Sequence, residues 1–424
     1  MVLAHKEAEQ RGSASFLLIT AIFLAATVLA LGWGIPIQKV MSGYQYNVLV
    51  ILIVMELFTN LIVSTHIMQY LAAKLALRSR GNKRAILVLF GLLMFVISAF
   101  LNNITAVMVI LPVIFVLLKA IDLNRRYVCI FFANLLAISN TGGASSPVGD
   151  FPAVIILTSG ITTFLDYLFR AMPVFILTTA ALIAYWAFRI RKSDDQELQE
   201  LAVNLLNARY KYIKVDKQAL IPLCMILGAM FLVWSFVPQH IVPPELVAVL
   251  GYGLAVATCV TQGKNIKISI DFKGVLTIAG FLFMASVISA TGLLEQLAGL
   301  LQAHISDPRM LLLSIMVITS LISGLFSAGP AAAAMMPVIV NLCNTTLSAQ
   351  THWVAIAYAA AICAGSSLFM WSATAGFILS NKVEEANLGH RWSINSYLIY
   401  GIINYLIQMT IAMTAIALIF SYNR

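Results

Sequence analysis

Residues 137–153, AISNTGGASSPVGDFPA, place polar and helix-breaking residues between two strongly apolar runs. Gly142, Gly143, Pro147 and Gly149 predict an interrupted membrane helix, and Ser139, Asn140, Thr141, Ser145, Ser146 and Asp150 supply oxygens and donors beside it. Irregular backbone within a bilayer persists only where protein or a water-filled cavity satisfies its polar groups. The exposed helix ends at such breaks hold ions and anionic substrates. We therefore predict a binding site at this break.

A second polar group lies in FLNNITAVMVILPV, where Asn102, Asn103 and Thr105 fall between two apolar runs. An Asn side chain offers a hard oxygen for a desolvated cation and an amide donor for an oxyanion. Asn is also a strong N-cap residue, so an alternative is that these residues only cap the second helix of a hairpin. Both interpretations are compatible with the sequence.

Two acidic residues fall in apolar surroundings, where ionisable groups are costly and usually functional. Asp150 follows Gly149 at the break, which favours a cation ligand or proton carrier over local turn chemistry. Glu56 lies in the middle of LIVMELFTNL. It is a second proton-coupling candidate if it faces the bundle interior, where burial favours its protonated form, or it pairs structurally with Asn60. Asp166 and Glu295 lie near expected membrane interfaces, where solvation is sufficient.

The composition requires a membrane to surround these residues. Of the 424 residues, 61% are hydrophobic and 10% charged, and the mean hydropathy is +0.93. Several windows match the roughly 20 apolar residues that a membrane-spanning helix needs. The five Cys residues show no metal-binding or disulfide spacing. No phosphate-binding loop, nucleophile elbow or dinucleotide motif is found in its required context, so an enzyme is not expected.

The net charge of +9 indicates topology rather than a nucleic-acid partner. Most Lys and Arg residues fall on one side if the chain starts in the cytoplasm and 85–118 and 310–343 are hairpins that enter and return. This arrangement gives nine crossings, including those near 47–72 and 274–297. A rival arrangement, in which each hairpin makes two full crossings, differs only in the depth of the tips at Asn102 and Ser327.

The chain carries an internal repeat. Residues 97–113, ISAFLNNITAVMVILPV, align without gaps on 322–338, ISGLFSAGPAAAAMMPV, and the blocks 64–75 and 137–153 align on 290–301 and 361–377. Three blocks in one order at nearly one offset indicate a duplication. We predict an N-terminal membrane repeat at 1–190, a charged cytoplasmic linker at 191–218, and a C-terminal membrane repeat at 219–424, inverted by an extra crossing near 219–235.

The two polar motifs together resemble the paired signature of the ion transporter superfamily, in the branch of arsenite-efflux permeases, NhaD-type sodium-proton antiporters and the P protein. The resemblance runs from about residue 47 to the C-terminus. It implies an all-α polytopic membrane protein with two inverted repeats, each with a re-entrant hairpin and a discontinuous helix. It also implies that Asn103, Thr105, Asn140, Gly142, Gly143 and Asp150 line the site.

The second half departs from this pattern. Its hairpin has Ser327, Ala328, Gly329 and Pro330 where the family usually has a polar pair. Its interrupted helix keeps Gly365, Ser366 and Ser367 but inserts Leu368, Phe369, Met370 and Trp371, and Thr374 aligns with Asp150. The predicted site therefore has one carboxylate and is asymmetric.

These observations favour an ion-coupled secondary transporter of a small inorganic ion or oxyanion, multi-pass in a bacterial-type inner membrane with a cytoplasmic N-terminus. No cofactor is expected other than Na⁺ or H⁺ as the coupling ion, with Na⁺ held by Asn103, Asn140 and Asp150, and with Asn102 nearby. Open alternatives are a cation antiporter, an organic-anion symporter and a transport-inactive scaffold. Membrane lipid is an expected partner, and a homodimer is compatible with the sequence.

Overall fold

The structure is a computed structural model. It describes residues 23–119, 121, 124–190, 204, 213–264, 272–386, 388 and 394–422. The predicted linker at 191–218 lies mostly outside these residues, as does the start of the first expected crossing. Within the described residues every regular element is a helix.

The first half consists of short and long helices joined by tight turns. An N-terminal helix is described over Phe23–Gly32. Asn82 is the N-cap residue of α5 (Lys83–Ser98), and its side-chain oxygen accepts hydrogen bonds from the backbone amides of Arg84 and Ala85 at 3.0 and 3.1 Å. After the N-terminal helix, the helices of the first half are α2 (Ile37–Ser42), α3 (Tyr46–Ser64), α4 (Ile67–Ser79), α5 (Lys83–Ser98), α6 (Asn103–Lys119), α7 (Arg125–Ser145), α8 (Phe151–Thr158) and α9 (Phe164–Arg189).

The second half repeats the order of a helical hairpin followed by an interrupted helix. The hairpins are α5–α6 and α15–α16, and the interrupted helices are α7–α8 and α17–α18. A 3₁₀ turn, η2 (Met370–Ser372), lies in the second interruption. The helices are α11 (Lys217–Phe236), α12 (Pro244–Thr261), α13 (Phe272–Ala290), α14 (Leu293–His304), α15 (Pro308–Phe326), α16 (Ala328–Asn344), α17 (Thr351–Ser366), α18 (Gly376–Glu385) and α19 (Ile394–Tyr422).

The helices fit a polytopic membrane protein. In the described part of the chain, seven are long and apolar enough to cross a bilayer, or up to nine if each of two bent pairs counts as one span. The prediction of an all-helical polytopic fold is confirmed. The predicted hairpin tips are also breaks, since α6 begins just after Asn102 and Ser327 separates α15 from α16.

Turns divide the chain within two of the predicted crossings. The expected crossing at 47–72 is divided between α3 and α4, because the left-handed conformation of His66, with φ of 60°, turns the chain. The expected crossing at 274–297 is divided between α13 and α14 at Gly292, with φ of 75°. The first turn lies in the sequence STH (64–66) and the second in ATG (290–292), and averaging hydropathy over a long window hides such short stretches.

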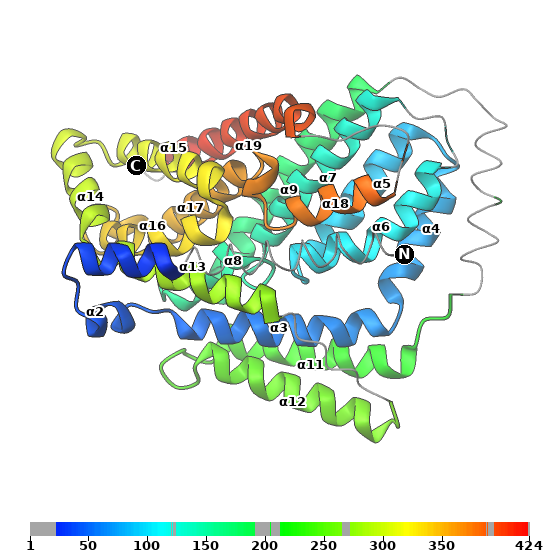
Figure 1. Cartoon of the computed structure of the whole chain (residues 1–424), viewed down its shortest axis with the longest axis horizontal. Coiled ribbons are helices and arrows are strands. Elements are labelled where there is room, and N and C mark those ends of the chain that lie inside the picture. The colour runs from blue at the N-terminus through cyan, green and yellow to red at the C-terminus, as the bar shows by residue number, and fades with distance from the viewer. Residues whose placement is uncertain are drawn as a thin grey trace.

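Helix α7 lies at the centre of the bundle. Its membrane-length window is 100% buried by protein, whereas α11 and α12 expose most of theirs. It contacts α5, α9, α17 and α19. Figure 1 shows α3, α11 and α12 side by side along one edge of the molecule. The predicted polar stretch is therefore carried by the helix best shielded from lipid.

Glycines bring the hairpins against the interrupted helices. A Cβ on Gly142 of α7 would lie 2.6 Å from the carbonyl oxygen of Phe95 in α5, and a Cβ on Gly365 of α17 would collide with the carbonyl oxygen of Ser320 in α15. Helix α7 runs unbroken to Ser145, so the prediction that Gly142 and Gly143 interrupt it is wrong. These glycines permit close approach instead.

We expect Gly142→Ala and Gly365→Ala to destabilise the protein by about 1–3 kcal/mol each, because the added methyl group meets backbone that cannot rotate away. Thermal unfolding of the purified protein in detergent measures this. Gly228→Ala in α11 is the matched control, because no atom lies within 4 Å of its added Cβ. Equal unfolding temperatures for the three variants would contradict this packing.

Candidate functional site

The interruption of the first broken helix covers Ser146–Asp150, between the end of α7 and the start of α8. Side chains satisfy carbonyls that this break leaves without helical partners. Ser146 donates to the carbonyl of Ala99 at the hairpin tip, Ser145 donates to Gly142 at 2.6 Å, and Tyr167 donates to Ala144 at 2.7 Å. Pro147 and Gly149 lie inside the break, as predicted. The break is thus sealed by protein on the hairpin side.

Asn103, Asn140 and Asp150 meet at this break. The Asn103 amide nitrogen lies 2.8 Å from Asp150 Oδ2 and 3.5 Å from Asn140 Oδ1. The three side chains are 0%, 3% and 4% exposed. Gly143 makes room for them, since a Cβ there would lie 2.6 Å from Asn103 Oδ1. The structure thus brings together the three residues that the sequence predicted to hold Na⁺.

Two oxygens of this cluster remain unused. Asn103 Oδ1 and Asp150 Oδ1 are buried without a hydrogen-bond partner. The Asp150 carboxyl lies next to the backbone N–H of Phe151 at the start of α8 but makes no regular capping hydrogen bond to that helix. Among the described residues, no ion pair with Lys, Arg or His is recorded for Asp150. A buried carboxylate in this setting requires a proton or a bound cation.

The cluster is joined to the second half of the chain. Asn140 Nδ2 donates to Ser367 Oγ at 3.3 Å, and the Ser367 hydroxyl donates to the Cys363 carbonyl at 3.1 Å. Tyr397 of α19 in turn donates to the Ser367 carbonyl at 2.8 Å. Asn140 is therefore hydrogen-bonded directly to the residue that ends α17.

Two tyrosines occupy equivalent places in the two halves. Tyr167 binds the carbonyl of Ala144 near the end of α7, and Tyr397 binds the carbonyl of Ser367 at the end of α17. Each side chain is 1% exposed. Neither tyrosine is among the site residues predicted from the sequence. The available signal was that a buried tyrosine needs a partner for its hydroxyl group, and a broken helix supplies free carbonyls.

A cavity of about 430 Å³ adjoins the break. It collects four other predicted residues from two helices and the two hairpin tips, namely Glu56, Asn102, Thr105 and Ser327. It also exposes the beginnings of α6, α8, α16 and α18, whose N-terminal dipoles carry partial positive charge. The remaining lining residues are Ile104, Phe151, Thr277, Ile278, Phe281, Leu282, Phe326, Gly329, Pro330, Trp371, Ala373, Thr374, Phe377 and Ile378.

The side chains of Asn102 and Thr374 both line the cavity, but only that of Asn102 has a recorded hydrogen bond. Asn102 Oδ1 accepts a hydrogen bond from the amide of Ile104 at 2.9 Å, which confirms the capping interpretation for Asn102. Thr374, the counterpart of Asp150, has a buried hydroxyl oxygen without a partner. Thr374 therefore offers the second half's polar contact to the cavity.

Several predicted site residues serve the helices themselves. Ser139 donates to Leu136 at 2.8 Å, and Ser366 donates to Cys363 at 2.8 Å, both within a helical turn. Thr141 contacts Thr179 of α9, with 2.8 Å between the hydroxyl oxygens. Gly142 and Gly365 make the close helix contacts described above. Their roles in this structure are packing and local hydrogen bonding.

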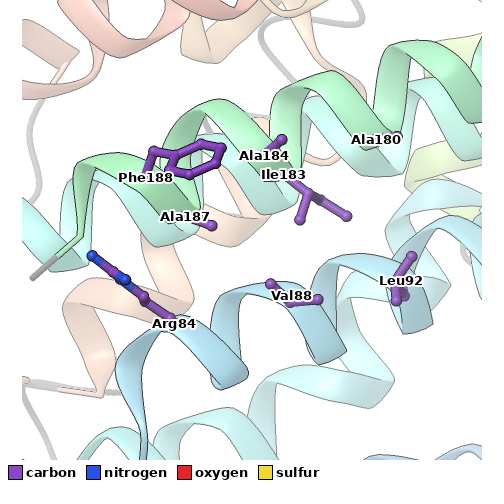
Figure 2. A pocket seen from close by; sticks show the side chains of 8 residues that line it. All are labelled: Arg84, Val88, Leu92, Ala180, Ile183, Ala184, Ala187 and Phe188. Atoms are coloured by element: carbon purple, nitrogen blue, oxygen red, sulfur yellow. The ribbon is translucent and has the colours of Figure 1, made fainter. Parts of the chain in front are cut away.

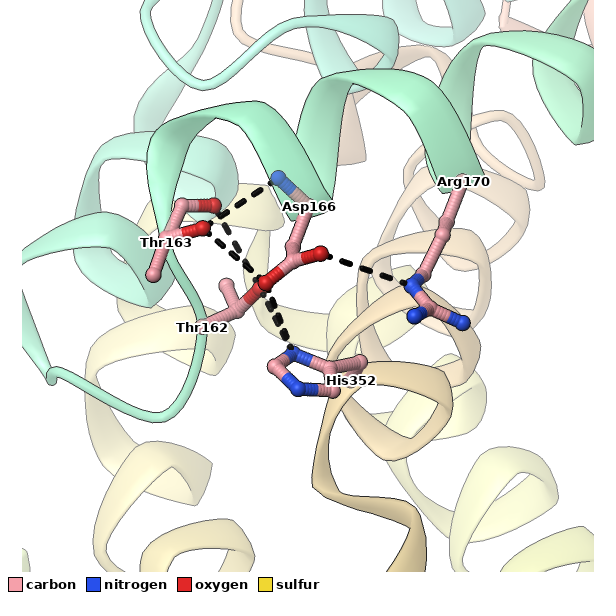
Figure 3. Close-up of polar contacts among 5 residues, drawn as sticks. All are labelled: Thr162, Thr163, Asp166, Arg170 and His352. Carbon is pink, nitrogen blue, oxygen red and sulfur yellow. Dashed lines mark hydrogen bonds and ion pairs between the residues drawn. The ribbon is translucent and has the colours of Figure 1, made fainter. Parts of the chain in front are cut away.

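A separate polar cluster joins the two halves away from the break. Figure 3 shows Asp166 between Arg170 and His352, at 3.9 and 3.8 Å, with Thr162 and Thr163 beside it. The Asp166 side chain is 40% exposed, as expected for a residue near an interface. Pairs exposed to this extent contribute little to stability, so this cluster is not a candidate for the transport site.

Comparison with known proteins places these features in context. A family model described as a citrate transporter matches residues 12–363 and 231–422. An uncharacterized transporter of Mycobacterium tuberculosis is 26% identical over 352 residues, covering 81% of this chain and 80% of its own. The magnetosome protein MamN of Magnetospirillum gryphiswaldense is 25% identical over 374 residues, covering 85% and 83%. The P protein of Sus scrofa is 26% identical over 186 residues, covering 42% of this chain and 22% of its own.

We expect Tyr167→Phe and Tyr397→Phe each to lower stability by about 1–2 kcal/mol, because each leaves a buried carbonyl without its donor while the ring is retained. Thermal unfolding in detergent measures the loss. Tyr46→Phe is the control, because Tyr46 is 66% exposed. Variants as stable as the control would show that these hydroxyl groups do not support the helix breaks.

Proposed function

Because the chain belongs to the citrate transporter family, we propose that it is an ion-coupled secondary active transporter that moves a small inorganic ion or oxyanion by alternating access. The chain is a multi-pass membrane protein of transporter type. The proposal adds the coupling, the substrate class and the location in an inner membrane with a cytoplasmic N-terminus. The location rests on the distribution of Lys and Arg along the sequence.

The observation that carries the proposal is the unpaired carboxylate oxygen of Asp150 beside the unpaired amide oxygen of Asn103. Both oxygens are buried, and helix α7, which carries Asn140, is fully buried by the rest of the protein. Hard oxygens of this kind are the preferred ligands of small hard cations. We assign the coupling ion, Na⁺ or H⁺, to Asp150, with Asn103 and Asn140 as the remaining side-chain ligands for Na⁺.

Coupling follows from the bond between Asn140 and Ser367. A cation that recruits Asn140 Oδ1 fixes the orientation of its amide and hence the donor to Ser367 Oγ. Occupancy of the site thereby changes the contact between the two halves of the chain. A ligand that binds the two conformations differently shifts the equilibrium between them, and alternating access requires such a shift.

We place the substrate in the cavity of about 430 Å³. Four helix beginnings and the hydroxyl groups of Thr105, Ser327 and Thr374 favour an oxyanion, whereas Glu56 opposes an excess of negative charge. The balance suits a small ion of low charge. Aromatic side chains from α8, α13 and α18 form much of the remaining wall and exclude water.

An organic-anion symporter is the second candidate, and the family description favours it. Among the described residues that line the cavity, one is acidic and none is Lys, Arg or His. A free tricarboxylate would therefore meet a carboxylate without a basic side chain to balance it. On this alternative the substrate enters with its charge partly neutralised by protons or a bound cation.

Asp150→Asn should abolish a saturable rise in unfolding temperature on addition of NaCl relative to choline chloride, or on acidification if the ion is H⁺. At a concentration of 100 times the dissociation constant, the wild-type gain is about 2.7 kcal/mol. Asp150→Ala should also lose gradient-driven uptake of the probes arsenite and citrate in proteoliposomes. Asp166→Asn is the control and retains both. Unchanged coupling in either Asp150 variant would rule out this assignment.

Glu56→Gln tests whether the cavity carboxylate holds a transported proton. If the ion at Asp150 is Na⁺ and Glu56 carries a transported proton, uptake by this variant should lose its dependence on pH while the stabilisation by NaCl is retained, because the uncharged amide resembles the protonated acid. Glu384→Gln, at an exposed position of α18, controls for a change of surface charge. A pH profile equal to that of the control would assign Glu56 to a structural role.

A further inference from the structure

A groove lies between α5 and α9 (Figure 2), and it shares no lining residue with the cavity described above. Its volume is about 430 Å³. We call it the α5–α9 groove and define it by Arg84, Val88, Leu92, Ala180, Ile183, Ala184, Ala187 and Phe188. Apart from Arg84, every residue that lines it is apolar.

The groove exists because small and large residues are placed unevenly along the two helices. Gly91 of α5 lets the side chain of Ile183 lie against the helix, since a Cβ there would be 3.1 Å from Ile183 Cδ1. On α9, Ala180, Ala184 and Ala187 leave the space beside this contact open. The groove is thus a concave apolar channel along the helix pair.

The walls of the groove face outward. Leu92 is 50% exposed and Phe188 is 85% exposed. In a protein with this many membrane-length helices, outward apolar side chains contact acyl chains rather than water. From Arg84 to Leu92 the groove follows α5 for eight residues, which is about 12 Å of helix. This length accommodates a large part of one acyl chain.

Arg84 gives the groove a charged end. Its Nε donates to the carbonyl of Ile190 at 2.6 Å, which orients the guanidinium group at the end of α9. Within the described residues this is the only contact recorded for its side chain, and no carboxylate is paired with it. Arg189, at the last turn of α9, adds a second cation near the same helix end. The terminal amino groups of Arg84 therefore remain available for an anion.

We propose that the α5–α9 groove binds an anionic phospholipid, with one acyl chain along Val88, Leu92 and Ile183 and the phosphate against Arg84. The charge of the groove matches such a lipid at one end, and its apolar walls match the chain along its length. Arg favours phosphate because its planar donors bind two oxygens at once. Basic sites between membrane helices on the cytoplasmic side recognise anionic headgroups in this way.

The proposal does not depend on the transport mechanism, because none of the groove residues lines the cavity or belongs to the Asp150 cluster. Two other occupants are conceivable. A second copy of the chain could pack on the alanine-rich face of α9, and the linker at 191–218 could cover the groove. Each predicts a different outcome in the experiment below.

The test is native mass spectrometry of the purified full-length protein after exchange into detergent containing phosphatidylglycerol or phosphatidylcholine. We expect retained phosphatidylglycerol and no comparable retention of phosphatidylcholine. Arg84→Gln should weaken phosphatidylglycerol binding about fivefold, the ordinary contribution of one basic side chain at an anionic surface. Ala184→Phe should weaken it by filling the groove, whereas Arg78→Gln, at an exposed position of α4 outside the groove, should have no effect.

Three results would overturn the proposal. Equal retention of the two lipids would remove the role of the phosphate. Unchanged retention in both Arg84→Gln and Ala184→Phe would place any bound lipid elsewhere. A dimer that dissociates in Ala184→Phe, or lipid binding that appears only after residues 191–218 are replaced by a Gly-Ser linker, would assign the groove to the second copy or to the linker.

Discussion

The structure depends on a carboxylate that is buried without a countercharge. Asp150 is 4% exposed, accepts one hydrogen bond from Asn103, and has no ion pair recorded within the described part of the chain. An unpaired charge in this setting costs several kcal/mol, and we propose that a proton or a cation neutralises this group. Gly143 gives Asn103 and Asp150 room to meet, Gly142 admits α5, and Tyr167 hydrogen-bonds to the end of α7.

The two halves share a framework but differ in chemistry. Gly142 and Gly365 both admit a neighbouring hairpin, and Tyr167 and Tyr397 both support the end of an interrupted helix. The carboxylate, by contrast, occurs in the first half only, and the second offers the Thr374 hydroxyl instead. The first half therefore binds the coupling ion in our account, while the second responds through Ser367. This division of roles accounts for two halves that have a similar order of helices but different polar residues.

The sequence predicted which polar residues form the candidate site better than it predicted where the helices end and turn. Polar residues in an apolar chain are conspicuous, so Asn103, Asn140 and Asp150 were found, as was the break at Pro147 and Gly149. The Gly142–Gly143 pair was assigned to the break, because the sequence does not distinguish a glycine that ends a helix from one that admits a neighbour. The partners of Tyr167 and Tyr397 depend on tertiary contacts, and the turns at His66 and Gly292 depend on a left-handed backbone at single residues. Hydropathy and residue spacing do not predict these features.

The most direct test is a cryo-electron microscopy structure of the protein in lipid nanodiscs, determined in NaCl and in choline chloride at neutral and acidic pH. Our account predicts that Ser146–Asp150 lies within the hydrocarbon thickness, where the side chain of Asp150 requires a proton or a cation. If the ion is Na⁺, it predicts density between Asn103 Oδ1 and Asp150 Oδ1 in NaCl alone; if the ion is H⁺, it predicts that acidification alone changes this site. A break at the level of the lipid headgroups, or a site that is the same under all these conditions, would contradict it.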